Sequence, residues 1–310
     1  MTEACIEIEG VGKRFGTVEA VRGLSLSIPH GSICGFLGPN GAGKSTTIRM
    51  IMSIIRPDVG TLRVLGGDAL ARKDRIGYLP EERGLYRKMR VREYLHYIGR
   101  LKGMSRSELN RSIPEWLERI ELSDAGPRRC EELSKGMQQK VQFLAAVLHE
   151  PELLILDEPF SGLDPVNAMV LNRLIQELHA EGRTILFSTH VLHQAERMCD
   201  RIVLIDRGEK LLDDSLVSIR RRFDPRALQV CPMEDPEAWS TAVALAPEIA
   251  TASPAKDGRV RVEMTTDATP DATMQACLQH GAVSSIEILR PTLDEIFFSL
   301  VGGRTEAVDD

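Results

Sequence analysis

The chain has 310 residues, of which 43% are hydrophobic and 27% are charged, and its formal net charge is −6. This composition is typical of a globular protein with two domains of ordinary size. The net negative charge excludes an overall positive surface for nucleic acid, so we expect no nucleic-acid partner. No apolar run approaches the roughly 18 residues needed to span a bilayer, and the acidic N-terminus lacks a signal-peptide pattern. The six cysteines form no C-x-x-C pair, which argues against zinc and disulfides and indicates a reducing cytosol.

The chain begins with short strands. Residues 4–9 alternate between apolar and polar side chains as a half-buried strand does, residues 10–16 are predicted to form a turn, and residues 18–28 one or two further strands. Phe15 lies in the predicted turn. An aromatic ring there could stack on a purine or cover the edge of a sheet, and the sequence leaves both interpretations open.

A complete phosphate-binding loop, G-x-x-x-x-G-K-[ST], follows a buried strand predicted at 32–37 and precedes a predicted helix. Its residues are Gly38, Pro39, Asn40, Gly41, Ala42, Gly43, Lys44, Ser45 and Thr46. The glycines let backbone N–H groups approach phosphates closely, Lys44 supplies a cation for the β- and γ-phosphates, and Ser45 offers a hydroxyl to Mg²⁺. We therefore expect ATP and Mg²⁺ as ligands.

Strands are predicted at 61–65 and 75–80, after which the pattern becomes helical between about 85 and 150. Near the end of this region, Ser134 is a plausible N-cap and Gly136 allows close approach at the first helical turn. These residues are compatible with a second anion site at the helix N-terminus or with an ordinary capped helix.

Residues 153–157 form a buried apolar run that ends in two carboxylates, Asp157 and Glu158. Taken alone, this pair could be a solvated strand end. In a chain with a phosphate-binding loop, Asp157 is expected to hold Mg²⁺ and Glu158 to polarise the attacking water. A further strand is predicted at 184–190, parallel to the first, and it would bring His190 towards the same γ-phosphate.

Over about residues 4–220 these motifs together resemble the ATP-binding cassette (ABC) family of ATPases. The Walker A loop corresponds to 38–46, the signature motif to 134–138, Walker B to 153–157 with Glu158 after it, the D-loop to 161–164 with Asp164, and the switch histidine to His190. The family implies an α/β P-loop NTPase fold, a RecA-like core with an antiparallel β subdomain and a helical insertion. It also implies a head-to-tail dimer in which the signature helix contacts the partner's ATP.

Two departures from the family pattern accompany the resemblance. The signature segment carries Lys135 and has Gln138 one place later than usual, although Ser134 and Gly136 remain. The usual Q-loop glutamine is replaced by Glu81, whose carboxylate can still approach Mg²⁺ but cannot donate an amide hydrogen bond. Residues 78–86 and 133–140 look like the branch of exporter ATPases that includes sodium-extrusion and antibiotic-resistance systems.

A small α+β accessory domain is predicted at 223–302, after the cassette of residues 1–220 and a linker at 220–225, with 303–310 as a tail. Residues 259–264 are predicted to form an edge strand, 269–281 a helix, and 284–289 a last strand. Thr292 and Glu295 form a capping box for a final helix that is expected to stop at Gly302 and Gly303.

The chain is accordingly expected to be the ATP-hydrolysing subunit of an export transporter on the cytoplasmic face of the cell membrane, as a homodimer or a cassette heterodimer. The resemblance implies that its membrane-spanning subunits are separate chains that dock on the loop at about 81–89, near Leu85 and Tyr86 with Arg83 beside them. A solvated charged loop is the other interpretation of these residues. A soluble cassette ATPase of translation or DNA repair is the alternative, although such proteins usually have two cassettes or a long coiled coil. A nucleotide-binding module without turnover is disfavoured by the intact Asp157, Glu158 and His190.

Overall fold

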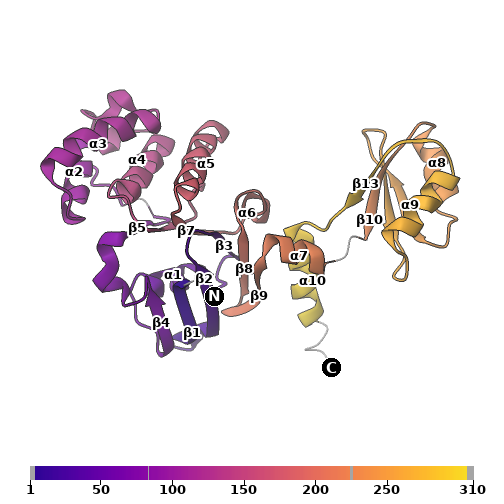
Figure 1. Cartoon of the computed structure of the whole chain (residues 1–310), viewed down its shortest axis with the longest axis horizontal. Coiled ribbons are helices and arrows are strands. Elements are labelled where there is room, and N and C mark those ends of the chain that lie inside the picture. Colours follow the sequence, from indigo (N-terminus) through magenta and orange to yellow (C-terminus); the bar gives the residue numbers. More distant parts are fainter. Residues whose placement is uncertain (1–3, 83, 224–225, 306–310) are drawn as a thin grey trace. The chain divides into compact units, whose positions relative to one another are not determined.

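The computed structural model describes residues 4–82, 84–223 and 226–305 and divides into two compact units after Leu216 (Figure 1). The first unit has two sheets and the second has one, each unit has its own core, and both mix helices with strands, as the α/β prediction requires. Among the helices of the described residues, none is long and apolar enough to cross a membrane.

A six-stranded sheet forms the centre of the first unit, in the order β5-β6-β7-β3-β8-β9. The pairs from β5 to β8 are parallel and β9 is antiparallel to β8. Its strands are β3 (Ile33–Leu37), β5 (Ile76–Leu79), β6 (Leu153–Asp157), β7 (Thr184–Thr189), β8 (Arg201–Asp206) and β9 (Glu209–Ser215). Strands β3, β6 and β7 are buried throughout, as strands covered on both faces must be. Their carboxyl ends meet at one edge, where parallel sheets bind ligands.

A three-stranded antiparallel sheet of order β2-β1-β4 completes the strands of this unit. It consists of β1 (Ala4–Phe15), β2 (Val18–Pro29) and β4 (Val59–Val64). The turn expected at 10–16 is wrong, because β1 continues to Phe15. The register shifts between Ile8 and Val11, and Gly10 has φ +58°, so a bulge rather than a turn accommodates the extra residue.

Helices follow the strands at the positions that the apolar patterns indicate. Around the central sheet lie α1 (Lys44–Ile51), α5 (Pro165–Ala180) and α6 (Leu192–Met198). The region between 85 and 150 is helical as expected, and contains α2 (Val91–Leu101), α3 (Arg106–Arg119) and α4 (Lys135–Val147). Short 3₁₀ helices are η1 (Ala69–Arg75), η2 (Ser123–Ala125) and η3 (Cys130–Glu132). Figure 1 shows α2, α3 and α4 as a group apart from β1 and β4.

The second unit is built around an antiparallel sheet of order β11-β12-β10-β13. Its elements are α7 (Leu216–Arg222), β10 (Ala227–Pro232), α8 (Pro236–Val243), β11 (Ile249–Pro254), β12 (Val260–Met264), α9 (Pro270–Gln279), β13 (Val283–Leu289) and α10 (Leu293–Thr305). From β10 to β13 the succession is β-α-β-β-α-β, the split arrangement of ferredoxin-like folds. Trp239 of α8 packs with Leu228 and Val262 of the sheet in a separate core.

Two expectations for this unit are wrong and one is confirmed. Strand β12 lies between β11 and β10, not at the edge, and α10 continues past Gly302 and Gly303 to Thr305. The capping box forms as expected, since Thr292 N donates to Glu295 Oε2 at 2.8 Å and Glu295 N donates to Thr292 Oγ1 at 3.2 Å. Residues 224–225 of the linker and 306–310 of the tail lie outside the described residues.

Candidate functional site

The phosphate-binding loop joins β3 to α1 and passes close to neighbouring backbone on two sides. A Cβ atom at Gly38 would lie 2.2 Å from the carbonyl oxygen of Ile205, and one at Gly43 would lie 2.4 Å from that of Ala20. Gly43 also has φ +102°, in the region that side chains rarely adopt. Both glycines are therefore needed so that β8 and β2 can hold the loop.

Gly208, in the turn between β8 and β9, ties the loop to β2. Its N–H donates to Ala42 O at 2.9 Å, and its carbonyl oxygen accepts from Arg22 N at 2.8 Å. Residues 206–208 have the sequence pattern of a turn, and this positioning role was not predicted. The available signal in the sequence was the glycine itself. The structure gives the reason for a glycine here, since a Cβ atom at position 208 would lie 2.9 Å from the carbonyl oxygen of Ala20.

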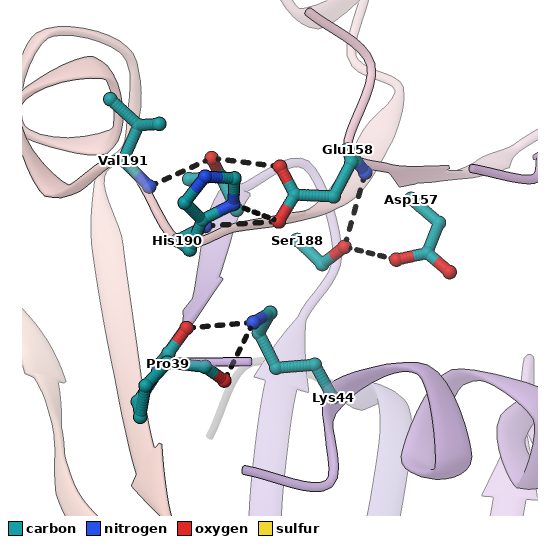
Figure 2. A network of polar contacts seen from close by, with 9 residues as sticks. Pro39, Lys44, Asp157, Glu158, Ser188, His190 and Val191 are labelled. Atoms are coloured by element: carbon teal, nitrogen blue, oxygen red, sulfur yellow. Dashed lines mark hydrogen bonds and ion pairs between the residues drawn. The ribbon is translucent and has the colours of Figure 1, made fainter. Parts of the chain in front are cut away.

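The ammonium group of Lys44 forms hydrogen bonds with the backbone of the phosphate-binding loop. Its Nζ donates to Gly38 O at 2.7 Å and to Pro39 O at 3.1 Å (Figure 2). Burial lowers the pKa of Lys44, and the negative charge of Glu158, followed by two other carboxylates, opposes that shift. Several carboxylates thus surround one lysine, so a triphosphate would need a further cation to bind here.

Asp157, at the carboxyl end of β6, is buried and hydrogen-bonded to hydroxyl groups. Ser188 Oγ, from β7, donates to its Oδ1 at 2.5 Å, and the Ser45 hydroxyl also forms a hydrogen bond with its side chain. Burial raises the pKa of Asp157, and the hydrogen bonds from Ser188 and Ser45 partly offset the increase. A hydroxyl and a buried carboxylate in contact are oxygen donors of the kind that Mg²⁺ prefers, so these residues fit the ion.

Glu158 is held in one orientation by the end of β7 (Figure 2). Its Oε1 lies 3.0 Å from His190 N and 2.8 Å from His190 Nδ1, and its Oε2 accepts from Thr189 Oγ1 at 3.3 Å. Its backbone has φ +49°, an uncommon conformation outside glycine. Such a conformation persists where the surroundings enforce it, as they do in functional sites. Ser188 and Thr189 were not predicted as parts of the site, and their only signal in the sequence is that two polar residues end an apolar strand.

A cavity of about 340 Å³ opens between the phosphate-binding loop and Glu158. Its lining includes Ala20, Asn40, Gly41, Lys44, Ser45, Thr46 and Glu81. The structure thus brings Glu81, Lys44 and Glu158 around one space. Phe15 is not among the residues that line it. It lies half exposed at the end of β1, with Lys13 Nζ 5.5 Å from the centre of its ring.

The signature residues lie at the start of α4, where Ser134 is the N-cap, as predicted: its Oγ accepts from Met137 N at 3.3 Å. Ser134 and Lys135 are exposed, whereas Gly136 is buried. The expected anion contact of this helix end in a neighbouring chain stays a prediction.

Gly136 packs against the start of α5. A Cβ atom at Gly136 would lie 2.7 Å from Asn167 Nδ2. Asp164, the N-cap of α5, accepts from Asn167 N at 2.9 Å and from Asn167 Nδ2 at 2.6 Å, and these hydrogen bonds lower the pKa of Asp164. The D-loop aspartate and the signature glycine are therefore linked within one chain through Asn167, a residue that sequence reasoning did not single out.

Three glutamines of α4 bind loops that come from other parts of the first unit. Gln138 Nε2 donates to Cys130 O and Leu133 O, both at 3.1 Å, so its amide group holds the segment that precedes the helix. Gln139 Nε2 donates to Pro159 O at 3.2 Å, just after Glu158. Gln142 Nε2 donates to Glu82 O at 3.1 Å, just after Glu81. The signal for the last two was that they are amides among apolar residues such as Val141 and Phe143, where the helix is buried.

The loop before α2 carries the two residues expected at a partner interface. Leu85 is half-buried and Tyr86 is 51% exposed. The Tyr86 ring centre lies 5.5 Å from that of Tyr97, edge to face, and 6.1 Å from that of Tyr94. Arg83, which was expected beside them, lies outside the described residues.

Backbone hydrogen bonds join this loop to the segment that leads into the signature helix. Glu131 N donates to Arg87 O at 3.0 Å and Cys130 N donates to Met89 O at 2.9 Å. Ser134 follows Glu131 by three residues, so the candidate interface and the candidate signature motif share one short scaffold.

Two family models match the chain. The model described as "ABC transporter" matches residues 21–161, and the one described as "ATP-binding protein DrrA1-3-like, C-terminal domain" matches residues 215–301. An uncharacterized ABC transporter ATP-binding protein, YhaQ of Bacillus subtilis, is 39% identical over 96% of this chain and 98% of its own length. The daunorubicin resistance ATP-binding protein DrrA3 of Streptomyces coeruleorubidus is 32% identical over 97% of both chains.

The matches to another relative and to one solved structure cover about seven tenths of this chain. The Nod factor export ATP-binding protein I of Rhizobium sp. is 40% identical over 69% of this chain and 72% of its own length. A structure titled as the ATP binding subunit of an ABC transporter has a TM-score of 0.66 and 33% identity, and the match covers 71% of this chain and 93% of the other.

Proposed function

Since the chain belongs to the family of ABC transporter ATP-binding proteins and is an ATPase, we propose that it drives export through membrane-spanning partners on separate chains. The resemblance drawn from the five motifs and its placement in the exporter branch are confirmed. A relative named for Nod factor export and the DrrA-like second unit support the direction of transport. The relatives described above give no support to a role in translation or DNA repair.

The observation that carries the proposal is the fixed position of Glu158 across the cavity from Lys44. We expect the loop N–H groups and Lys44 to bind the phosphates of ATP. Glu158 would accept a proton from a water aligned with the γ-phosphate, and His190 and Thr189 would hold its carboxylate in place. A fixed carboxylate saves the cost of orienting it at each turnover.

Mg²⁺ is the cofactor that the oxygen donors at this site favour. Ser45 and Asp157 would hold it, with Glu81 nearby in the cavity wall. When bound, the ion supplies positive charge that offsets the phosphate oxygens. Glu81, in place of the family's usual glutamine, would offer the ion a carboxylate acceptor from the cavity wall.

We propose a head-to-tail dimer, in which Ser134 and Gly136 of one chain complete the ATP site of another. The exposure of Ser134 at a helix N-terminus supports this role, because the first N–H groups of a helix favour anions. The division into a cassette at 1–220 and an accessory domain at 223–302 belongs to the same proposal. We also propose that the chain lies on the cytoplasmic face of the membrane.

Mixing two inactive variants tests the shared site. Lys44→Ala should weaken the chain's own hold on ATP, and Ser134→Arg should place bulk and charge where the neighbour's phosphate would bind. Each variant alone is expected to show little turnover. A mixture should regain part of the activity, measured as phosphate release, because each mixed dimer has one intact composite site. Absence of recovery in a mixture shown to form mixed dimers would contradict the proposal.

A double change in the loop before α2 tests the membrane partner. Leu85→Ala with Tyr86→Ala should abolish co-purification with the membrane subunit and transport, because it removes the apolar anchors of the loop. ATP affinity and thermal unfolding should change little, since neither residue lines the ATP cavity.

Leu245→Ala provides the control, because this exposed leucine lies in the second unit. It should leave both co-purification and transport unchanged. Unchanged transport in the double variant would mean that the partner docks elsewhere.

A further inference from the structure

A groove of about 1020 Å³ lies between α2, α3 and the turn at Gly126. The ATP cavity and the groove have no lining residue in common. Four arginines and one glutamate contribute to its wall: Arg90, Arg92, Glu93, Arg100 and Arg106. In a chain of net charge −6, this concentration of positive charge is local and strong enough to attract anions.

The positive charge of the groove is only partly offset by its own wall, which has four arginines and one carboxylate. Glu93 is engaged at the start of α2, where its Oε2 accepts from Arg90 N at 3.1 Å. Among the ion pairs of the residues that the structure describes, all within 4.0 Å, none involves any of the four arginines. Arg100 donates instead to a carbonyl oxygen, that of Met104 at 3.1 Å. Guanidinium groups without carboxylate partners are suited to hold phosphate through paired hydrogen bonds.

The pKa of His96 reflects the positive charge of the groove. It lies in the groove wall, and its pKa is lowered by partial burial, then by the charges of Arg92 and Arg106, against a hydrogen bond with Asn110 that raises it. Its neighbours thus disfavour a further positive charge. An incoming anion would relieve this repulsion.

Exposed aromatic and aliphatic side chains accompany the arginines of α2. Tyr97 lines the groove and is 40% exposed, and Leu101, at the end of α2, is 63% exposed. Tyr86, which contacts Tyr97 edge to face, extends this exposed surface. Tyrosine beside arginine with an exposed aliphatic residue is typical of the headgroup level of a membrane, where rings contact lipid and cations contact phosphate. A soluble acidic peptide would need the arginines but would leave these apolar side chains uncovered.

We propose that the groove between α2 and α3 binds the phosphate headgroup of an anionic phospholipid, so that the helical region contacts the membrane surface directly. Arg92 and Arg106 come from opposite walls and would hold the phosphate between them. The inference goes beyond the proposed ATPase and docking functions and requires neither ATP turnover nor a partner subunit.

Sedimentation of the full chain with lipid vesicles tests this inference. The chain should bind vesicles that contain phosphatidylglycerol more tightly than vesicles of phosphatidylcholine alone. Arg92→Gln with Arg106→Gln should weaken binding to the anionic vesicles by roughly tenfold or more. Arg92→Lys with Arg106→Lys keeps the charge but loses the paired hydrogen bonds, so its loss should be smaller but measurable. ATP turnover in solution should remain unchanged in all of them.

Arg221→Gln with Arg222→Gln is the matched control, because it removes two exposed positive charges from α7. An equal loss in this control would overturn the inference in favour of general electrostatic attraction. Equal binding to both vesicle types, or no binding to either, would also overturn it. Full competition by millimolar inorganic phosphate would identify a free-anion site instead. Loss of the membrane subunit from the glutamine variant with vesicle binding intact would identify a protein partner.

Discussion

Glu158→Gln is expected to lower ATP turnover by roughly 10²-fold or more while ATP binding is retained. The amide keeps the size of the side chain and can still contact His190, but it cannot accept a proton from water. Because the two hydrogen bonds at Oε1 are only 2.8 and 3.0 Å long, the side chain should stay near its position. Steady-state phosphate release and equilibrium ATP binding, measured on the same preparation, separate the two effects.

A suitable control is Glu150→Gln, which removes a carboxylate just before β6 whose side chain is 77% exposed. It should leave turnover nearly unchanged. Near-normal hydrolysis by Glu158→Gln would remove this residue from the role of general base. Loss of ATP binding in that variant would point instead to a role in holding the nucleotide.

Gly38→Ala is expected to destabilise the first unit by several kcal/mol, a scale reached only when backbone or core packing is disrupted. Its Cβ atom would lie 2.2 Å from the carbonyl oxygen of Ile205, and neither partner is a flexible side chain that could move aside. The loop would have to leave β8, so ATP affinity should fall by more than tenfold. Thermal unfolding without nucleotide measures the first effect, and titration with ATP measures the second.

Gly41→Ala separates crowding from backbone strain. A Cβ atom at Gly41 meets nothing within 4 Å, although its φ of +81° disfavours alanine. The expected destabilisation is therefore only about 1–2 kcal/mol. If Gly38→Ala unfolds at the same temperature as Gly41→Ala, then contact with β8 is not what fixes the residue at position 38.

Much of the first unit could be predicted because its strands carry unbroken apolar runs. The run before Gly38 and the run that ends at Asp157 predict buried parallel strands, and both are present as β3 and β6. The order of the motifs then identifies the fold and brings Asp157 and Glu158 to the phosphate-binding loop. Capping residues in the sequence also predicted where two helices begin, since Ser134 and Thr292 both form their expected capping hydrogen bonds.

The remaining features depend on contacts between distant segments, which no local pattern encodes. Gly10 suggested a turn, yet pairing with β2 and β4 keeps the chain extended through a bulge. The alternation at 259–264 suggested an edge strand because a half-buried strand looks the same at an edge or in the middle of a sheet. Strand β9 and the positioning role of Gly208 were not predicted for the same reason, since both depend on contacts with β8 and β2.

The three-way attachment of α4 has a consequence for cooperativity. Its first residue follows Ser134, and its Gln139 and Gln142 bind the backbone next to Glu158 and Glu81. If a neighbouring chain's nucleotide shifts Ser134, a rigid helix carries the displacement to the chain's own catalytic loop in the same movement. If this displacement brings Glu158 and Glu81 towards their own nucleotide, filling one composite site raises affinity at the other, and ATP occupancy rises with a Hill coefficient above one.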